Sequence, residues 1–503
     1  MYWLLGLLLL YVVVKGLMNA AARSLSFDEL LTMAVASQPG PKGIWDALAH
    51  AVDGQPPLFY WVERLAMGLA SNKQVALRLP SILGMVCSMA FTFVYLKRRS
   101  GELIAFLCAS FLMSTCLFSI FTSNARPYSL LIACITFALV CYQRATSPVW
   151  TALLGISLAL AESFHYYAIF AMIPFGLAEV VVFCRTSRFR WSVWIALAFG
   201  ALPLIFWWPL LAHLKAYYGS HFWARYGLSS LPKTYGVFLL TDAAYGSAFV
   251  AVLFVTVLFG SVVGSRLLSR WVKFSRVEIR KSDQVEGVLI LGLMALPLIA
   301  FAVTKVVHGA MRDVHALGAV IGICLALGCL LSGARPVAVA LFALFVFSAV
   351  GIHEVSFWRA YRSPHPESAA TSVQEFVQTA SYPDLPVVVS GLPYLTINYY
   401  ASPAWSKRFI FLTDENLEAK YLGNDNMDKN FAVLRPYMPI HVSDFSEFTS
   451  SHAEFLLYAE DPGAGFDWLP YHLSRDPWSL QVLARDPSRV LYLVRMKNAV
   501  PAN

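Results

Sequence analysis

Apolar segments of nearly membrane-spanning length follow one another along the first 350 residues, and this repetition constrains the fold more than any other feature. A spanning helix needs about 20 mostly apolar residues, within a range of roughly 17–25. Segments that approach this length are 1–20, 76–96, 102–121, 128–143, 149–163, 168–184, 191–211, 237–263, 287–304, 314–331 and 336–352. The sequence therefore predicts an α-helical polytopic membrane protein with about 11 transmembrane helices.

The composition excludes several other classes of protein. The 503 residues are 58% hydrophobic and 14% charged, whereas soluble proteins have roughly 45–50% and 25%. The net charge of +8 comes from Lys and Arg that cluster in particular loops, which membrane topology explains better than nucleic-acid binding. The eight cysteines lie in or beside apolar segments without the paired spacing of a zinc site, so we expect free thiols.

Basic residues set the expected orientation in the membrane. They fall in alternate loops, which the positive-inside rule makes cytoplasmic: Lys97–Arg99, Arg144, Arg185–Arg190, Arg266–Lys281 and Arg335. The opposite, extracytoplasmic face then holds the first loop (21–75) and the loops 124–127, 165–167, 212–236 and 305–313, together with the C-terminal region. Every loop with unusual polar residues thus lies on one face, although this was not an input to the assignment.

Residues 353–503 are predicted to form a separate soluble α/β domain on the extracytoplasmic side. Hydropathy falls after a linker marked by Pro364 and Pro366. Short strands are expected at 385–390, 408–413, 454–458 and 490–494, with helices at 372–380 and 393–400. A Gly-rich phosphate loop is absent from this sequence. We therefore expect a transmembrane domain over 1–352 and a soluble domain over 353–503.

The first loop carries an acidic pair, Asp28 and Glu29, directly after the first span. A carboxylate at the mouth of an apolar cavity can take a proton from an incoming hydroxyl or amine, or bind a divalent metal ion. The structural alternative is a solvated helix cap, or an ion pair with Arg23. Charged residues at membrane depth are costly to hold and usually functional, so both interpretations stay open.

The same loop continues with Asp53, Gln55 and the aromatic run that includes Tyr60. The Pro56-Pro57 pair followed by aromatic residues favours a helix that begins at, and lies on, the membrane interface. Asp53 and His50 are about one helical turn apart, a weak indication of a metal site. Asp53 can equally cap the interfacial helix, and for His50 a structural role is favoured.

Cationic and aromatic residues mark three later loops on the extracytoplasmic face. Arg126 and Tyr128 follow the third span, His165 and Tyr166 follow the fifth, and the loop before the tenth span contains Lys305, His308, Arg312, Asp313 and His315. A guanidinium can grip a phosphate through two hydrogen bonds, and cations near the surface suit anionic headgroups. The alternatives are Arg126 reaching to lipid headgroups, an aromatic belt, and an Arg312–Asp313 pair in a solvated turn.

Together these motifs resemble the C-type glycosyltransferases that use polyprenyl-phosphate sugars. The resemblance is to the bacterial branch with the lipid A aminoarabinose transferases and the protein O-mannosyltransferases, and it covers about residues 1–350. It rests on Asp28-Glu29, on the runs 55–61 (Gln-Pro-Pro-Leu-Phe-Tyr-Trp) and 77–81 (Leu-Arg-Leu-Pro-Ser), and on 125–128 (Ala-Arg-Pro-Tyr) and 165–166 (His-Tyr). Singly the motifs are weak, but their order and shared face make the set fairly specific.

The resemblance implies roles for these residues. Asp28 would act as the catalytic base or position the acceptor, and Glu29 would support it or bind a metal ion, with Asp53 as a second metal ligand. The donor and acceptor would be bound by Asp53, Gln55, Tyr60, Arg126, Tyr128, His165, Tyr166, Lys305 and Arg312. Two departures matter: many relatives have an acidic residue where this chain has Asn124, and an Arg-Tyr pair where it has Arg312-Asp313.

The implied function is transfer of a sugar from a polyprenyl-phosphate donor to an extracytoplasmic lipid, glycan or protein, with inversion at the anomeric carbon. The expected place is a bacterial inner membrane, with the C-terminal domain in the periplasm, and a divalent metal ion is one option as cofactor. Membrane lipids are expected partners and nucleic acids are not.

Two other classes of function compete with the enzyme. A lipid flippase or transporter would place polar residues near the membrane midplane and facing both sides. Here the span interiors hold few charges, with Lys15 and Glu162 among the exceptions. An assembly protein would recruit a partner through its soluble domain. It would keep its function in Asp28→Asn, which the enzyme would lose.

Overall fold

The computed structural model describes residues 1–222, 226–239, 281–306, 312–362, 369–379, 382–460, 467–485 and 489–497. The chain divides into two compact units. The first, here called the transmembrane unit, comprises Met1–Arg23, Gln55–Trp208 and Tyr226–Ser363. The second, here called the sheet unit, comprises Ser24–Gly54, Pro209–Arg225 and Pro364–Asn503. Residues 24–54 of the first loop therefore group with the C-terminal residues.

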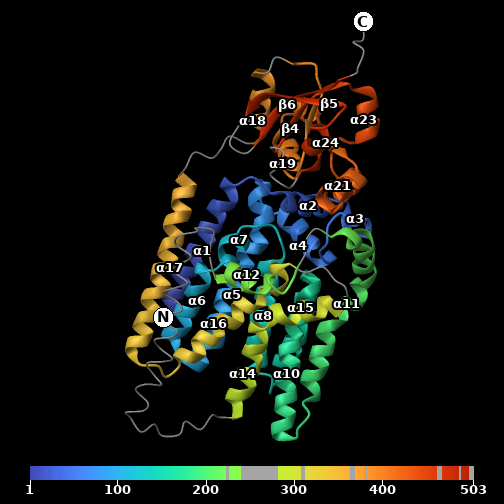
Figure 1. The fold of residues 1–503 in the computed structure, drawn as a ribbon. Coiled ribbons are helices and arrows are strands. Elements are labelled where there is room, and N and C mark those ends of the chain that lie inside the picture. The colour runs from blue at the N-terminus through green and yellow to red at the C-terminus, as the bar shows by residue number, and fades with distance from the viewer. Residues whose placement is uncertain are drawn as a thin grey trace. The chain divides into compact units, whose positions relative to one another are not determined.

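The transmembrane unit is built from helices (Figure 1). Five helices of the described residues are long and apolar enough to cross a membrane: α1 (Tyr2–Ala22), α5 (Lys73–Ser100), the segment Tyr166–Thr186 that contains α10 (Ile169–Thr186), α11 (Trp191–Tyr218) and α17 (Pro336–Arg362). Shorter apolar helices are α6 (Glu102–Phe111), α8 (Tyr128–Tyr142), α9 (Pro148–Phe164) and α16 (Gly318–Leu331). A multi-pass membrane protein is confirmed, whereas the count of about 11 spans stays a prediction. Most of the predicted span 237–263 lies outside the described residues.

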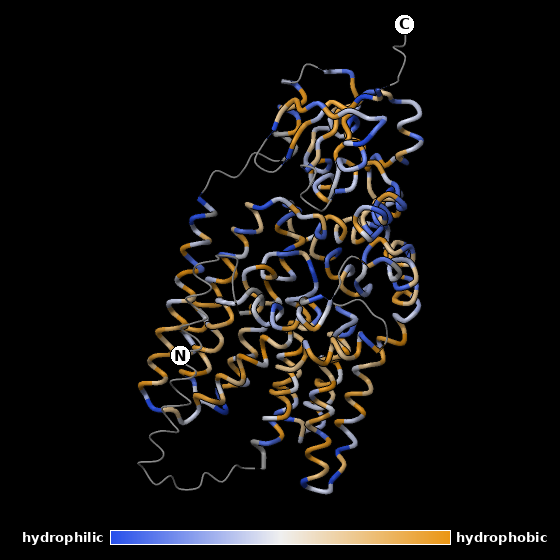
Figure 2. Tube along the Cα trace, viewed as in Figure 1, coloured by the Kyte–Doolittle hydropathy of each residue, from blue (hydrophilic) through white to orange (hydrophobic). Residues whose placement is uncertain are grey.

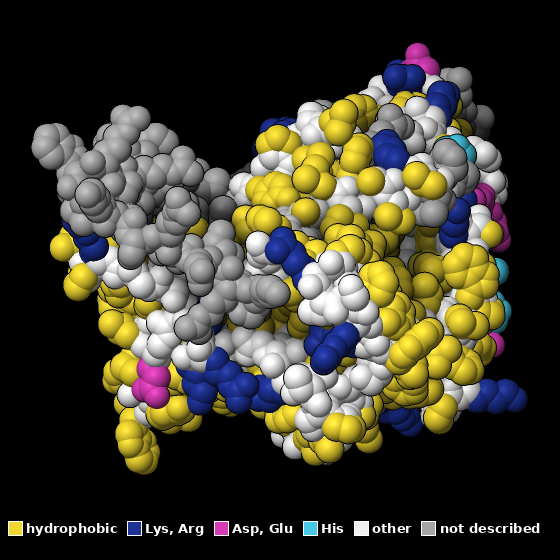
Figure 3. Space-filling view, turned by 90° about the horizontal axis from the view of Figure 1, so that it is seen from below, with side chains coloured by type: hydrophobic (Ala, Val, Ile, Leu, Met, Phe, Trp, Pro, Cys, Tyr) yellow, Lys and Arg dark blue, Asp and Glu magenta, His cyan; other side chains and the backbone are white. Residues whose placement is uncertain are grey.

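Large apolar side chains on the outer helices are exposed, as a membrane protein requires. Trp3 on α1, Ile205 on α11 and Leu344 on α17 are examples, and these helices are hydrophobic along most of their length (Figure 2). Such a surface would cause aggregation in water but suits contact with lipid. Viewed from below, the described part of the face carries Lys and Arg side chains beside hydrophobic ones, and fewer acidic ones (Figure 3).

Small residues let the inner helices approach closely. A Cβ atom added at Gly84 on α5 would lie 2.7 Å from the carbonyl carbon of Ser129 on α8. Any larger side chain would therefore push the two helices apart, which is the reason small residues are favoured in membrane helix interfaces.

Three predicted spans differ from the helices that form. The segment 102–121 breaks after α6 into a 3-10 turn (Leu112–Ser114) and α7 (Cys116–Phe121), where the hydroxyls of Ser114 and Thr115 donate to the carbonyls of Phe111 and Leu112, both at 2.7 Å. Hydroxyls that bond back to the chain in this way compete with the helix. The segment 336–352 extends as α17 to Arg362, two residues before Pro364, which disfavours helix in the residue preceding it.

The third difference is a bend inside the predicted span 287–304. Helices α14 (Lys281–Met294) and α15 (Leu296–Val306) meet at 60°. Pro297 lacks the N–H that would continue the helix. The hydroxyl of Tyr235, on α12 (Ser230–Leu239), donates to the carbonyl of Met294 at 2.7 Å and so satisfies an acceptor at the bend.

The sheet unit contains a six-stranded sheet in the order β3-β2-β1-β4-β6-β5. Strands β1 (Val387–Val389), β2 (Phe409–Thr413), β3 (Val442–Asp444) and β4 (Glu454–Ala459) are parallel, and β5 (Trp478–Arg485) and β6 (Val490–Met496) are antiparallel additions. The remaining helices of its C-terminal part are α18 (Ala369–Thr379), α19 (Pro393–Tyr400), α20 (Pro403–Ser406), α21 (Glu415–Leu422), α22 (Asn426–Leu434), α23 (Phe445–Ser451) and α24 (Trp468–Leu473). A C-terminal sheet domain is confirmed.

The first-loop helices α2 (Phe27–Ala36) and α3 (Gly40–Ala49) are part of the sheet unit. The backbone N–H of Leu25 donates to the hydroxyl of Tyr400 at 2.9 Å, and the rings of Phe27 and Phe431 meet edge to face at 5.6 Å between centroids. Sequence alone did not indicate this pairing of the two ends of the chain.

Candidate active site

The loop that carries Arg126 is fixed by a serine on another helix. It lies between α7 and α8, and the N–H of Arg126 donates to the carbonyl of Asn124 at 2.7 Å, which makes a tight turn. The hydroxyl of Ser81, on α5, lies 2.6 Å from the carbonyl oxygen of Asn124 and 3.0 Å from that of Arg126. Ser81 and Arg126 are both buried. The motif 77–81 therefore positions the Arg126 motif.

Arg78, in the same motif, has a structural task. Its side chain is 1% exposed, and Nη1 donates to the carbonyls of Ala20 at 2.9 Å and Arg23 at 2.7 Å. The last carbonyls of a helix lack partners within it, and a cation at this end also opposes the negative pole of the helix. Arg78 thus holds the end of α1 against α5.

Four aromatic and imidazole rings form a cluster beside this loop. The ring of His165 lies 5.5 Å from Tyr128, 5.6 Å from His315 and 5.8 Å from Tyr167 between centroids. His315 stacks on Tyr167 at 3.7 Å and an angle of 17°. His165 ends α9, Tyr167 lies in the 3-10 turn Tyr166–Ala168, and His315 lies in the 3-10 turn Asp313–Ala316. Two of the predicted residues, Tyr128 and His165, are thus brought together.

The hydrogen bonds of the two histidines determine which ring nitrogen carries the proton. The backbone N–H of Tyr167 donates to Nδ1 of His165, and that of Arg312 donates to Nδ1 of His315, both at 3.2 Å. A nitrogen that accepts a hydrogen bond is unprotonated, so each neutral ring carries its proton on Nε2. Nε2 of His165 is buried and has no partner among the described residues. The Nε2–H group of His165 is therefore a hydrogen-bond donor that could bind an acceptor atom of a ligand.

The other cations lie at different distances from this cluster. Arg312 is half-buried, and its backbone bond to His315 places it at the start of the 3-10 turn. Lys305 is exposed near the end of α15, with Nζ 5.6 Å from the centroid of Phe301. The structure as described shows no contact between Lys305 and the ring cluster. Arg312 is the better placed of the two for a ligand at the cluster.

The interfacial helix expected after Pro56 forms as α4 (Pro57–Met67). Gln55 and Tyr60 are both buried, and Oε1 of Gln55 has no hydrogen-bond partner within the described chain. Tyr60 packs edge to face on Phe59 at 5.2 Å, and Tyr166 is also buried. An unpaired buried acceptor is costly, so Oε1 of Gln55 is available to accept a hydrogen bond from a ligand.

In the sheet unit, Glu29 forms a capping box at the start of α2. Its Oε2 accepts the N–H of Ser26 at 2.9 Å and lies 3.1 Å from the hydroxyl of the same residue. Asp28 is half-buried in the first turn of the helix. The helix-cap alternative thus describes Glu29 but leaves the carboxylate of Asp28 outside the cap.

Asp53 is buried in a tight turn, where its Oδ1 accepts the N–H of Gly54 at 2.7 Å. It does not cap the interfacial helix, because Pro56 is the N-cap residue and has no side-chain bond to the helix. Within the described ranges no three His, Cys, Asp or Glu side chains are grouped to hold a metal ion. The suggested metal-binding roles of Glu29 and Asp53 therefore gain no support from geometry.

Ser81, Tyr167 and His315 lie in the motifs and loops noted in the sequence, but none of them was predicted as a site residue. Ser81 ends the motif 77–81, and its spacing from Arg78 on one helix was the available signal. Tyr167 and His315 come together only because two 3-10 turns distant in sequence pack against each other. Sequence spacing contains no information about that contact.

Comparison with known proteins gives one match to a family. Residues 54–213 match the family described as dolichyl-phosphate-mannose-protein mannosyltransferase. This confirms the resemblance to the C-type glycosyltransferases, over less than half of the chain. The matched region includes Gln55, Tyr60, Arg126 and His165, but neither Asp28 nor Arg312. No curated protein matches the chain.

Solved structures show more distant similarity. ArnT from Cupriavidus metallidurans bound to undecaprenyl phosphate is 15% identical, with a TM-score of 0.45 over 97% of both chains. An oligosaccharyltransferase from Archaeoglobus fulgidus, tethered to an acceptor peptide, is 14% identical with a TM-score of 0.46, over 92% of this chain and 70% of that one.

Proposed function

We propose that this protein is an integral-membrane glycosyltransferase that moves a sugar from a polyprenyl-phosphate donor to an extracytoplasmic acceptor. The observation that carries the proposal is the ring cluster at the Arg126 loop, where the buried His165 presents an Nε2–H without a partner among the described residues. A buried donor without a protein acceptor indicates a ligand with oxygen acceptors, because leaving such a group unpaired is costly. The family match over residues 54–213 supports the same class of reaction.

The chemistry requires stabilisation of the leaving phosphate. A polyprenyl-phosphate sugar has an activated anomeric carbon, and negative charge grows on the phosphate as the glycosidic bond breaks. Preorganised donors in a site of low dielectric stabilise such charge strongly. Arg126 and Arg312 would supply the charge, and His165 a neutral donor. Tyr128, Tyr166 and Gln55 would complete the walls of the donor site, with Tyr60 and Lys305 further from the phosphate.

Asp28 is the proposed base. It would accept the proton of the acceptor hydroxyl or amine while that group attacks the anomeric carbon opposite the leaving phosphate. A single displacement inverts the configuration at that carbon. Glu29 would hold the first turn of α2, and thereby Asp28, through its capping box. Asp53 would hold the turn that precedes Gln55.

The proposed setting is a bacterial inner membrane, with the sheet unit in the periplasm. The support is the distribution of Lys and Arg in alternate loops, because basic residues favour the cytoplasmic side. The acceptor would then meet the site from the periplasm, and the donor from the outer leaflet.

Glycosyl transfer by the purified full-length protein tests the proposal. Lipid nanodiscs would contain a panel of polyprenyl-phosphate sugars, with wild type compared with Asp28→Asn and Arg312→Ala. Asp46→Asn is a matched control, because Asp46 is an exposed carboxylate in the same loop. Its Oδ2 accepts a hydrogen bond from the hydroxyl of Tyr437 at 2.9 Å, and its Oδ1 lies 3.7 Å from Nδ1 of the exposed His50. Arg335→Ala is the control for the second variant, because Arg335 is exposed.

Consumption of one donor by wild type and by both controls, but not by folded Asp28→Asn and Arg312→Ala, would support the enzyme and name its sugar. A folded wild type that moves such lipids between leaflets without cleaving any of them would replace the proposal by a flippase. Full activity in Asp28→Asn would agree with a glycosyltransferase but would show that Asp28 is not the base.

A further inference from the structure

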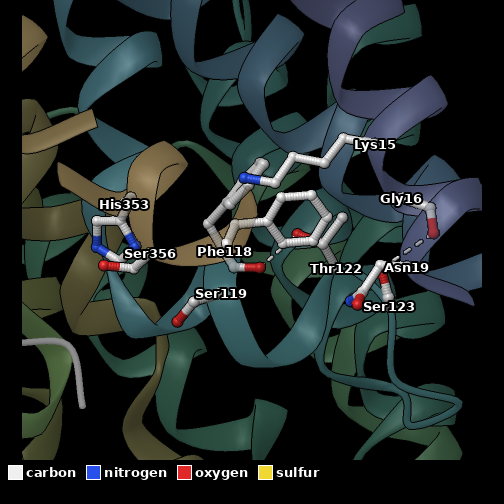
Figure 4. Close-up of a pocket in the computed structure, with 10 residues that line it drawn as sticks. Lys15, Gly16, Asn19, Phe118, Ser119, Thr122, Ser123, His353 and Ser356 are labelled. Carbon is white, nitrogen blue, oxygen red and sulfur yellow. Dashed lines mark hydrogen bonds between the residues drawn. The ribbon is translucent and has the colours of Figure 1, made fainter. Parts of the chain in front are cut away.

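A cavity of about 220 Å³, with both polar and apolar side chains in its lining, lies among α1, α7 and α17 in the transmembrane unit. It is lined by Lys15, Gly16, Asn19, Phe118, Ser119, Thr122, Ser123, His353, Ser356 and Phe357 (Figure 4). A water molecule needs roughly 10–15 Å³ by the same measure, and the pockets that bind drug-sized ligands measure roughly 300–1,000 Å³. The cavity therefore has room for one small ring or headgroup. None of its residues belongs to the proposed catalytic site.

Lys15, which lines the cavity, is held in an ion pair. Nζ of Lys15 lies 2.6 Å from Oε1 of Glu354, and the hydroxyl of Tyr11 also donates to this carboxylate. The ammonium is 4.4 Å from the ring centroid of Phe357 and 5.5 Å from that of Phe118. Buried ion pairs contribute little net stability, and charged residues within the membrane usually mark a site. Lys15 was one of the few charges that the sequence placed within a span.

The remaining polar groups are arranged around an open space. Asn19 and Ser356 have no side-chain hydrogen bond to any described residue, although both line the cavity. The hydroxyl of Thr122 donates to its own helix at 2.6 Å and that of Ser123 to the carbonyl of Gly16 at 3.3 Å. These two oxygens keep lone pairs that can accept from a ligand. The cavity thus offers both hydrogen-bond donors and acceptors.

We propose that this cavity binds a neutral sugar ring. Its charge is balanced, since Glu354 already neutralises Lys15, so neither an anion nor a cation would gain much from binding here. Hydroxyl and amide groups suit the hydroxyls of a sugar, which both donate and accept. The faces of Phe118 and Phe357 suit its C–H groups, because an aromatic face is partially negative.

The position of the cavity gives the inference a functional meaning. Thr122 and Ser123 directly precede the loop of Asn124 and Arg126, whose carbonyls Ser81 holds. A sugar bound here would touch the same loop from the side of α1 and α17. The site goes beyond the proposed transfer reaction and does not depend on it, because binding is measured without any donor.

Saturation-transfer NMR on the full-length protein tests the proposal. The protein would be held in phosphatidylcholine nanodiscs free of sugar detergents, and the probes would be methyl and octyl glycosides of glucose, galactose and mannose. The test variant is Asn19→Leu/Ser356→Leu, which removes two cavity groups without breaking a hydrogen bond among the described residues. Ser71→Leu is the control, at an exposed serine of the same unit. Thr122→Val is a second test variant in case the first does not fold.

We expect at least one glycoside to bind wild type and Ser71→Leu, with affinity at least fivefold lower in the test variants. Tighter binding of the octyl form, lost in the same variants, would assign a glycolipid as the source of the sugar, and equal binding would assign a free glycan. Unchanged binding in the folded test variants would overturn the site. If inorganic phosphate binds and none of the glycosides does, the ligand of this cavity is not a sugar and the proposal is wrong.

Discussion

Replacing Ser81 by alanine isolates the contribution of a buried hydroxyl that touches no substrate. In wild type this hydroxyl bonds the carbonyls of Asn124 and Arg126, both in the loop of the proposed phosphate-binding Arg126. A lost hydrogen bond that leaves a buried acceptor unpaired costs about 1–3 kcal/mol. We therefore expect Ser81→Ala to lower the free energy of unfolding by about 2 kcal/mol and to loosen the loop.

Activity should fall with stability because Arg126 must meet the phosphate at a fixed distance. Displacement of a charged group by about 1 Å can cost on the order of 100-fold in rate. We expect kcat/KM for glycosyl transfer to fall about 10- to 100-fold.

Ser88 provides the matched control. It lies two turns later on α5 and is equally buried, but its hydroxyl donates at 2.8 Å to the carbonyl of Gly84 in its own helix. That carbonyl is already part of the helix ladder, and alanine is the better helix former by about 0.5 kcal/mol. Ser88→Ala should thus change stability by less than about 0.5 kcal/mol and leave the rate unchanged. Thermal unfolding in nanodiscs and donor-consumption kinetics would measure both effects. Equal losses in the two variants would refute the reasoning.

Three further predictions concern other groups. Glu29→Gln should keep at least half of the activity, because Gln also completes a capping box; a loss of 100-fold or more, restored by added Mg²⁺ or Mn²⁺, would show a metal ligand instead. His165→Phe should raise the Kd for the polyprenyl-phosphate sugar by about tenfold, because one hydrogen bond contributes roughly 1.4 kcal/mol. His165→Gln retains a hydrogen-bond donor near the place of Nε2 and should bind the sugar lipid more tightly than His165→Phe. Equal Kd values for the two variants would show that His165 donates no hydrogen bond to this ligand. Burial raises the pKa of Glu418 from 4.5 to about 7, with Asp425 and Glu415 adding to the shift. The folded state therefore favours its protonated form, and the local free energy of unfolding should fall by at most about 3 kcal/mol as pH rises from about 4.5 to 7. Hydrogen exchange of residues 415–434 should show this slope in wild type and a smaller slope in Glu418→Gln, where Asp428, whose pKa is also raised by burial, still titrates.

Long apolar helices and the sheet domain were predictable because each depends on local sequence. Segments such as 2–22 and 73–100 are apolar over a full membrane thickness, and the strands β1, β2, β4 and β6 are short apolar runs between turn residues. Strand β3, with three residues, and β5, with much of its length exposed, carry weak patterns of this kind. They form because neighbouring strands offer unpaired backbone groups.

The candidate site was predictable residue by residue but not as an arrangement. The sequence drew attention to His165, Tyr128 and Arg312 through their residue types and their common face. The sequence did not indicate that Arg78 holds the end of α1. An Arg at this position can bind either backbone carbonyls or a phosphate, and the sequence does not distinguish the two. Nor did it indicate that His315 stacks on Tyr167, since this contact depends on two turns about 150 residues apart.

The bend between α14 and α15 sets the depth at which the chain can meet a lipid. Helix α15 has 11 residues and is thus about 16 Å long. With α14 along the membrane normal, a tilt of 60° reduces the rise of α15 to roughly 8 Å. The end of α15 at Val306 is then lower by roughly 8 Å than a straight helix would place it, about the thickness of one headgroup layer. Under the proposed function, the phosphate of a polyprenyl lipid would be bound at the depth where it lies in the bilayer, and no free energy would be needed to lift it out.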